Sequence, residues 1–135
     1  MAYLLDTNIV SRLVREPGGP IEQRIEELGR VAACTSVIVA AELRYGAIRR
    51  NSQRLRQQLE AILAKLRVLP FEAPADEVYG QIRTRLERAG TPISAMDMLI
   101  AAHALAFGHT LVTDNEREFR RVEGLQVENW MRADD

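Results

Sequence analysis

Four acidic side chains of this chain follow strand-like runs or lie in helix-like patterns close to such runs. They are Asp6, Glu42, Asp97 and Asp114. Any one of them alone is explained as a helix cap, a solvated side chain or a turn residue. Chance is a poorer explanation for four acids that all lie near the ends of predicted strands or the starts of predicted helices. Hard cations such as Mg²⁺ and Mn²⁺ take carboxylate oxygens as ligands. The four acids therefore predict a metal site suited to phosphoryl chemistry.

Two of these acids lie in the stretch whose elements are clearest. Ser94 is placed to cap a helix, and the almost wholly apolar pattern that follows indicates that this helix is buried. Asp97 falls in its first turn, where the helix dipole favours a negative charge. Residues 110–113 form a short apolar run typical of a buried parallel strand, and Asp114 comes directly after it. We expect the two acids to share one edge of the fold.

Short apolar runs alternate with helical patterns along the whole chain. Strands are expected at residues 3–5, 31–35, 68–71, 110–113 and 126–128, with helices between them. This alternation predicts one α/β domain spanning residues 1–135, a three-layer α/β/α sandwich with a mainly parallel sheet. Open sheets of this class bind ligands at the carboxyl edge of the strands, which is where Asp6 falls.

The composition limits the class of protein. Hydrophobic residues make up 47% and charged residues 27%, and the net charge of −1 excludes a generally basic nucleic-acid coat. Cys34 has no second cysteine to pair with, which indicates a reducing compartment. No segment approaches the roughly 18 apolar residues of a membrane-spanning helix, and no basic region precedes the first apolar run. We therefore expect a soluble, cytoplasmic protein without a membrane partner.

Taken together, the motifs resemble those of PIN-domain ribonucleases of the VapC type, the toxins of bacterial toxin–antitoxin systems. The matching segments are Leu4–Asn8, Ala41–Gly46, Asp97–Ala104, Leu111–Asn115, Arg117–Phe119 and Gly124–Trp130. They occur in the family's order and spacing across essentially the whole chain. The resemblance implies a PIN-like domain, a dimer, and an endoribonuclease that depends on Mg²⁺ or Mn²⁺. It also implies a cognate VapB-type antitoxin, bound in a toxin–antitoxin hetero-oligomer.

The resemblance also assigns the site. It makes Asp6, Glu42 and Asp97 both catalytic and metal-binding residues, and we assign the same two roles to Asp114 as the fourth acid. Asp6 and Asp97 would bind the principal metal, and the other two acids would complete the site directly or through water. Close relatives often carry Asn at the position of Asp114, and there Glu118, one helical turn away, is the substitute. We favour Asp114 because it directly follows a strand. Cleavage by an activated water would leave a 5′-phosphate and a 3′-hydroxyl.

Neighbouring residues admit two interpretations each. Thr7, Asn8 and Thr113 either orient the carboxylates or belong to turns. Arginines around the turn of the helical hairpin between residues 36 and 65 either contact RNA phosphates or are simply solvated; they include Arg49, Arg50 and Arg54. His103 is expected to be a packed core residue rather than a catalytic base.

The hairpin also carries more apolar residues than two solvated helices need. They are Leu43, Tyr45, Ile48, Leu55 and Leu59. We expect a homodimer through this surface, and an antitoxin helix on it or beside it.

Two other classes of function remain open at this point. The first is a phosphatase of the haloacid dehalogenase type with Asp6 as its nucleophile. Such enzymes carry a second aspartate two positions on, where this chain has Asn8. The second is a binding module that has lost its catalytic activity, and the four intact acids argue against it.

Overall fold

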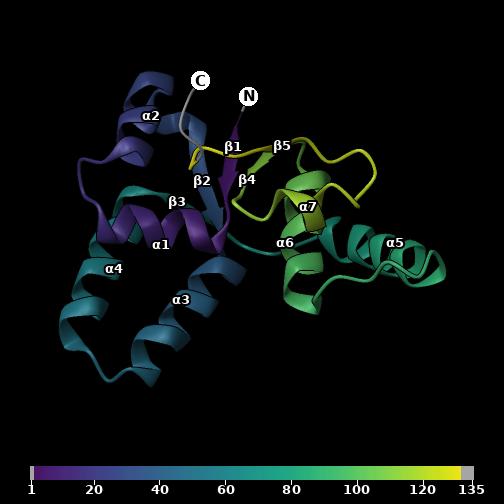
Figure 1. Cartoon of the computed structure of the whole chain (residues 1–135), viewed down its shortest axis with the longest axis horizontal. Helices are drawn as coiled ribbons and strands as arrows, with labels where there is room; N and C mark the ends of the chain where they lie inside the picture. The colour runs from purple at the N-terminus through teal and green to yellow at the C-terminus, as the bar shows by residue number, and fades with distance from the viewer. Residues whose placement is uncertain (1, 132–135) are drawn as a thin grey trace.

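A five-stranded parallel sheet forms the centre of the molecule (Figure 1). The computed structural model describes residues 2–131. The strands are β1 (Tyr3–Leu5), β2 (Ala33–Ser36), β3 (Arg67–Leu69), β4 (Thr110–Val112) and β5 (Val127–Glu128). Their order is β3-β2-β1-β4-β5, and every neighbouring pair is parallel. The predicted α/β sandwich is confirmed, and the sheet is parallel throughout.

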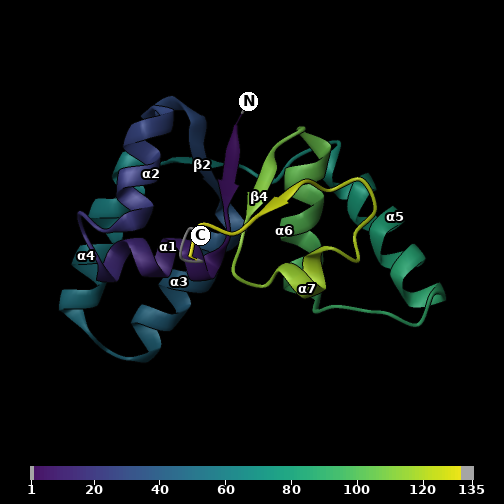
Figure 2. The ribbon, with the colours of Figure 1, turned by 45° about the horizontal axis from the view of Figure 1, so that its top comes forward.

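Helices cover the sheet on two sides. They are α1 (Thr7–Arg15), α2 (Pro20–Leu28), α3 (Val37–Arg49), α4 (Gln53–Lys65), α5 (Ala75–Arg88), α6 (Ala95–Ala106) and α7 (Glu116–Phe119), with a 3-10 turn at Arg30–Ala32. In both views α1 to α4 lie on one side of the strands and α5 to α7 on the other (Figures 1 and 2). No helix within residues 2–131 is long and apolar enough to cross a membrane.

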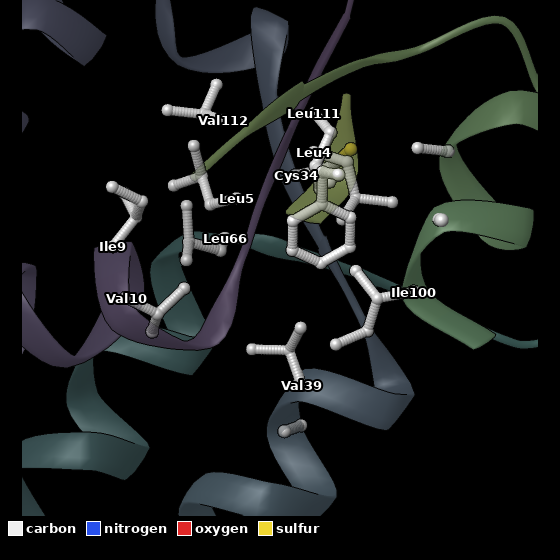
Figure 3. Close-up of a cluster of buried hydrophobic side chains, with 14 of the residues drawn as sticks. Leu4, Leu5, Ile9, Val10, Cys34, Val39, Leu66, Ile100, Leu111 and Val112 are labelled. Carbon is white, nitrogen blue, oxygen red and sulfur yellow. The ribbon is translucent and has the colours of Figure 1, made fainter. Parts of the chain in front are cut away.

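The core lies where the central strands meet the helices. Leu4 of β1 pairs with Cys34 of β2 and Leu111 of β4, and all three are fully buried. Figure 3 shows these side chains beside Ile9 from α1 and Ile100 from α6, which are also fully buried. Because α6 is enclosed on several sides, it needs apolar residues around most of its circumference, as its sequence indicated.

The second and third strands are displaced from their expected positions. β2 begins at Ala33 rather than Val31, because its first residue is fixed by pairing with Tyr3 of β1. Val31 lies in the preceding 3-10 turn and is 81% exposed. β3 ends at Leu69, and beyond it the ring of Phe71 packs edge-on against His103 with centroids 5.4 Å apart.

Side-chain caps start α1, α3 and α6, the helices that lead into the site. Ser36 accepts a hydrogen bond from the Ile38 N–H (3.0 Å) at the start of α3. Ser94 accepts one from the Asp97 N–H (3.1 Å) at the start of α6, as expected. Asp6 caps α1 directly after β1. Asp6 and Asp97 thus lie at the N-terminal ends of α1 and α6.

Candidate active site

Asp6 is the most buried acid of the site, with 4% of its surface exposed. It lies at the carboxyl end of β1, and both of its carboxylate oxygens accept hydrogen bonds. Oδ1 accepts from the Thr7 N–H (2.8 Å), and Oδ2 accepts from the Thr113 hydroxyl (2.7 Å). That hydroxyl oxygen in turn accepts from the Asn115 N–H (3.0 Å), which leaves its own hydrogen for Asp6. The carboxylate is therefore fixed from both sides.

The electrostatic environment of Asp6 disfavours its charge. Burial raises the pKa of Asp6 from 3.8 to about 6. The hydrogen bonds from Thr113 and Thr7 lower this pKa, and the charges of Asp97 and Glu42 raise it. Three acids therefore lie close enough to interact electrostatically, although they are far apart in the sequence.

Glu42 reaches the site from α3 and is tied to Asp6 through one residue. Its Oε1 accepts a hydrogen bond from the Thr7 hydroxyl (2.6 Å). Thr7 thus donates its backbone N–H to Asp6 and its hydroxyl to Glu42. This answers the open interpretation of Thr7 and Thr113: both contact carboxylates of the cluster.

Asp97 lies in the first turn of α6 and is half-buried. Burial raises its pKa, a hydrogen bond from Ser94 lowers it, and the charges of Glu42 and Glu118 raise it further. Glu118 of α7 therefore belongs to the same electrostatic group as Asp97.

Asp114 is placed differently from the other three predicted acids. It is exposed, its N–H donates to Asn8 Oδ1 (3.2 Å), and its own Oδ1 accepts from the Asn129 amide (3.2 Å). Asp6, Glu42 and Asp97 therefore interact with one another and Glu118 interacts with Asp97, whereas the Asp114 carboxylate is bonded to Asn129 after β5. Sequence reasoning gave Asn129 no individual role, and the only signal was its place in the matching C-terminal segment.

The donor set fits a hard cation. Within residues 2–131, the side chains as they lie form no group of three or more Asp, Glu, His or Cys residues that could hold a metal ion. The cluster nevertheless offers only carboxylate and hydroxyl oxygens, which are ligands for Mg²⁺ and Mn²⁺. Because burial and neighbouring charges raise the pKa of Asp6, a dication would stabilise its ionised form.

His103 is a core residue, as predicted. It is fully buried, its Nδ1 lies 2.7 Å from Ser36 Oγ, and burial lowers its pKa. The rings of Phe71 and Phe107 pack against it edge-on. It is packed inside the protein and is not available as an acid or base for substrate.

The apolar surface expected on the hairpin of α3 and α4 is smaller than the sequence indicated. Leu59 is only 3% exposed, so its inclusion in that surface was wrong. Leu43 and Leu55 pack against the core as half-buried residues. Because α4 lies against both α1 and α3, its leucine face turns inward. Tyr45 and Ile48 stay outside, at 65% and 58% exposure.

The PIN domain family matches residues 3–125 of the chain. The ribonuclease VapC2 of Rickettsia felis is 38% identical over 132 residues, which cover 96% of this chain and 98% of the relative. The chain belongs to the PIN-domain family and, within it, to the VapC ribonucleases. The tRNA(fMet)-specific endonuclease VapC of Shigella flexneri is 35% identical over 131 residues, covering 96% and 98% of the two chains.

A solved structure shares the fold of this VapC-family chain. A chain in the complex of VapBC2 from Rickettsia felis with a promoter DNA fragment superposes with a TM-score of 0.85 at 36% identity. The superposition covers 96% of this chain and 99% of the other. The family expected from the motifs is therefore confirmed. PIN-domain ribonucleases are generally metal-dependent.

Proposed function

We propose that this VapC-family protein is the toxin of a type II toxin–antitoxin system and cleaves RNA with Mg²⁺ or Mn²⁺ at its acidic cluster. Similarity to ribonucleases over 96% of the chain supports the reaction class. One observation carries the metal dependence: the charges of two acids from other elements, Glu42 and Asp97, act on a buried Asp6 whose pKa is raised to about 6. A protein keeps such a cluster at a cost in stability unless a cation or a basic group occupies it.

Each residue of the cluster has a proposed role. Asp6 and Asp97 hold the principal cation, and Glu42 completes the site directly or through water. Thr7 and Thr113 hold Asp6 in one orientation before the cation arrives. A divalent cation at this place supplies polarisation of the phosphate and lowers the pKa of a nearby water. Attack on phosphorus would then leave a 5′-phosphate and a 3′-hydroxyl.

From the sequence, Asp114 was preferred to Glu118 as the fourth acid. That preference stays a prediction. Two observations favour Glu118 instead: its charge acts on Asp97, and the Asp114 carboxylate is bonded by Asn129. We therefore place Glu118 beside Glu42 as the acid that completes the cluster.

The proposal is tested by cleavage of RNA in EDTA, Mg²⁺ and Mn²⁺. Because one relative is a tRNA(fMet)-specific endonuclease, an initiator tRNA is the first substrate to try. Asp97→Asn should lower the rate at least 100-fold, while Asp76→Asn should not change it. Asp76 is a matched control, since it also lies in the first turn of a helix but is exposed on α5.

Two results of this experiment would refute the assignment. Full activity in EDTA would exclude the metal role, and products with a 2′,3′-cyclic phosphate would exclude attack by water. A covalent aspartyl-phosphate trapped at Asp6 would instead support the phosphatase alternative.

The partner of this toxin is proposed to be a VapB-type antitoxin, in the cytoplasm. A groove of about 170 Å³ lies between α1 and the α3–α4 hairpin, and its lining includes Glu42, Arg15 and Arg50. Exposed Tyr45 and Ile48 lie on the same hairpin. An apolar antitoxin segment in this groove could place a basic side chain beside Glu42 and so compete with the cation. The homodimer through the hairpin stays a prediction as well.

A further inference from the structure

The side chain of Asn129 joins three segments at the end of the sheet. Asn129 directly follows β5. Its Nδ2 donates to Asp114 Oδ1 (3.2 Å), just after β4, and to Glu116 Oε2 (3.0 Å), the first residue of α7. Its Oδ1 accepts from the Met131 N–H (2.8 Å). The amide thus uses both of its donor hydrogens and its acceptor.

The chemistry of this contact requires an amide at position 129. The Met131 N–H needs an acceptor, which fixes the oxygen of the Asn129 side chain towards it and turns the NH₂ group to the two carboxylates. A carboxylate at position 129 would accept from Met131 equally well. It would then direct a negative oxygen at Asp114 and Glu116, and like charges at this distance repel.

The segment that Asn129 holds has little support of its own. α7 has only four residues, its cap residue Asn115 makes no side-chain capping bond, and so short a helix is not stable by itself. It is anchored by Phe119, which is fully buried, and at its first residue by the bond between Glu116 and Asn129. The connection before α7 is also held by the bonds from the Asp114 N–H to Asn8 and from the Asn115 N–H to Thr113. The direction of α7 therefore depends on these contacts.

We propose that Asn129 is a positioning residue, which fixes the connection from β4 to α7 so that Glu118 faces Asp97 and the acidic cluster. In the same contact it holds Asp114 at the β5 edge, outside the cluster. This inference rests on the metal-dependent site proposed above. Asn129 need not touch the cation or the RNA; it acts through the placement of α7.

The test compares Asn129→Ala and Asn129→Asp with the parent protein. Mn²⁺ affinity is measured by calorimetry, steady-state cleavage gives kcat and KM, and hydrogen exchange in EDTA reports on residues 116–121. Both variants should bind Mn²⁺ about 10-fold more weakly or worse. They should lower kcat with KM for RNA unchanged, and exchange faster in α7. Asn129→Asp should be the more damaging. Gln126→Ala is the control, because this exposed side chain directly precedes β5, whereas Asn129 directly follows it.

A further variant exchanges the hydrogen-bond donors and acceptors of this contact. It distinguishes a positioning role of Asn129 from a general loss of folding. The variant Asn129→Asp with Asp114→Asn and Glu116→Gln places two amides opposite one carboxylate, so the hydrogen bonds can form in the reverse sense. It should recover Mn²⁺ affinity to within about threefold of the parent and restore slow exchange in α7.

Three outcomes have distinct meanings. Parent-like Mn²⁺ affinity and α7 exchange in Asn129→Asp would overturn the role of Asn129 while leaving the metal site intact. Failure of the exchange variant to recover Mn²⁺ affinity, with slow α7 exchange restored, would also overturn it and would favour Asp114 as a ligand. A parent protein that neither binds Mn²⁺ nor cleaves RNA with it would refute the proposed function itself, and the inference with it.

Discussion

Replacing Asp6 by Asn should stabilise the metal-free protein at neutral pH while abolishing cleavage. The pKa of Asp6 is raised from 3.8 to about 6, and its side chain is almost fully buried. A difference of roughly two units corresponds to roughly 3 kcal/mol of destabilisation when the carboxyl is ionised in both states. Asn cannot accept both existing hydrogen bonds, and the loss of one costs about 1 kcal/mol. The variant should therefore gain about 1–2 kcal/mol at pH 7.5.

The sign of the pH dependence follows from the direction of the shift. Below the unfolded pKa of 3.8 the carboxyl is protonated in both states, and its burial costs nothing through ionisation. As the pH rises to about 6 the unfolded state releases its proton first, so the folded parent progressively loses stability across this window. Above this pH window the folded parent carries the full free-energy cost of ionising Asp6. Asp6→Asn should lack this part of the pH dependence.

Thermal melting in EDTA at pH 4 and pH 7.5 measures both effects. At pH 7.5 the variant should melt about 3–8 °C above the parent, and at pH 4 the advantage should vanish or reverse. Adding Mn²⁺ at 100 times its dissociation constant should stabilise the parent by about 2.7 kcal/mol, and the variant much less. If Asp6→Asn melts below the parent at both pH values and Mn²⁺ changes neither protein, Asp6 is only a helix cap and the metal-site argument is refuted.

Three further predictions address other parts of the molecule. Asp97→Asn should melt at or above the parent temperature in EDTA at pH 7.5 and lose most of the stabilisation by Mn²⁺; a melting temperature clearly lower in EDTA would point to a purely structural aspartate. Arg49→Glu with Arg50→Glu should weaken RNA binding at least 10-fold in 50 mM salt and much less in 500 mM salt, as fluorescence anisotropy can show; equal binding would leave these arginines as solvated residues. Tyr45→Ser with Ile48→Ser should weaken antitoxin binding or self-association without lowering the melting temperature by more than about 3 °C, measured by sedimentation and melting; unchanged assembly would remove the hairpin from the interface.

Local signals in the sequence were sufficient for the elements that form the site. Ser36 and Ser94 are capping residues that act within one turn of their own helices, so their role could be read without the fold. The apolar circumference of α6 likewise reflects burial on several sides. Alternation of strands and helices predicted a parallel sheet, and a parallel sheet gathers the carboxyl ends of its strands at one edge. For that reason Asp6, Glu42 and Asp97 were predicted together and lie together, while their roles in metal binding stay predictions.

Other features depend on contacts between distant segments, which no local pattern contains. The start of β2 is set by its register against Tyr3, and Leu59 is buried because α4 lies against α1 and α3. The choice between Asp114 and Glu118 is of the same kind. Both follow β4 in the sequence, and Asp114 was preferred because it comes sooner after the strand. Only the fold brings Asn129 from β5 onto the Asp114 carboxylate, 15 residues away, and turns α7 so that the charge of Glu118 acts on Asp97. Helix caps and apolar periodicity are properties of neighbouring residues, whereas the direction of the Asp114 side chain is fixed by a hydrogen bond from a residue that follows a different strand.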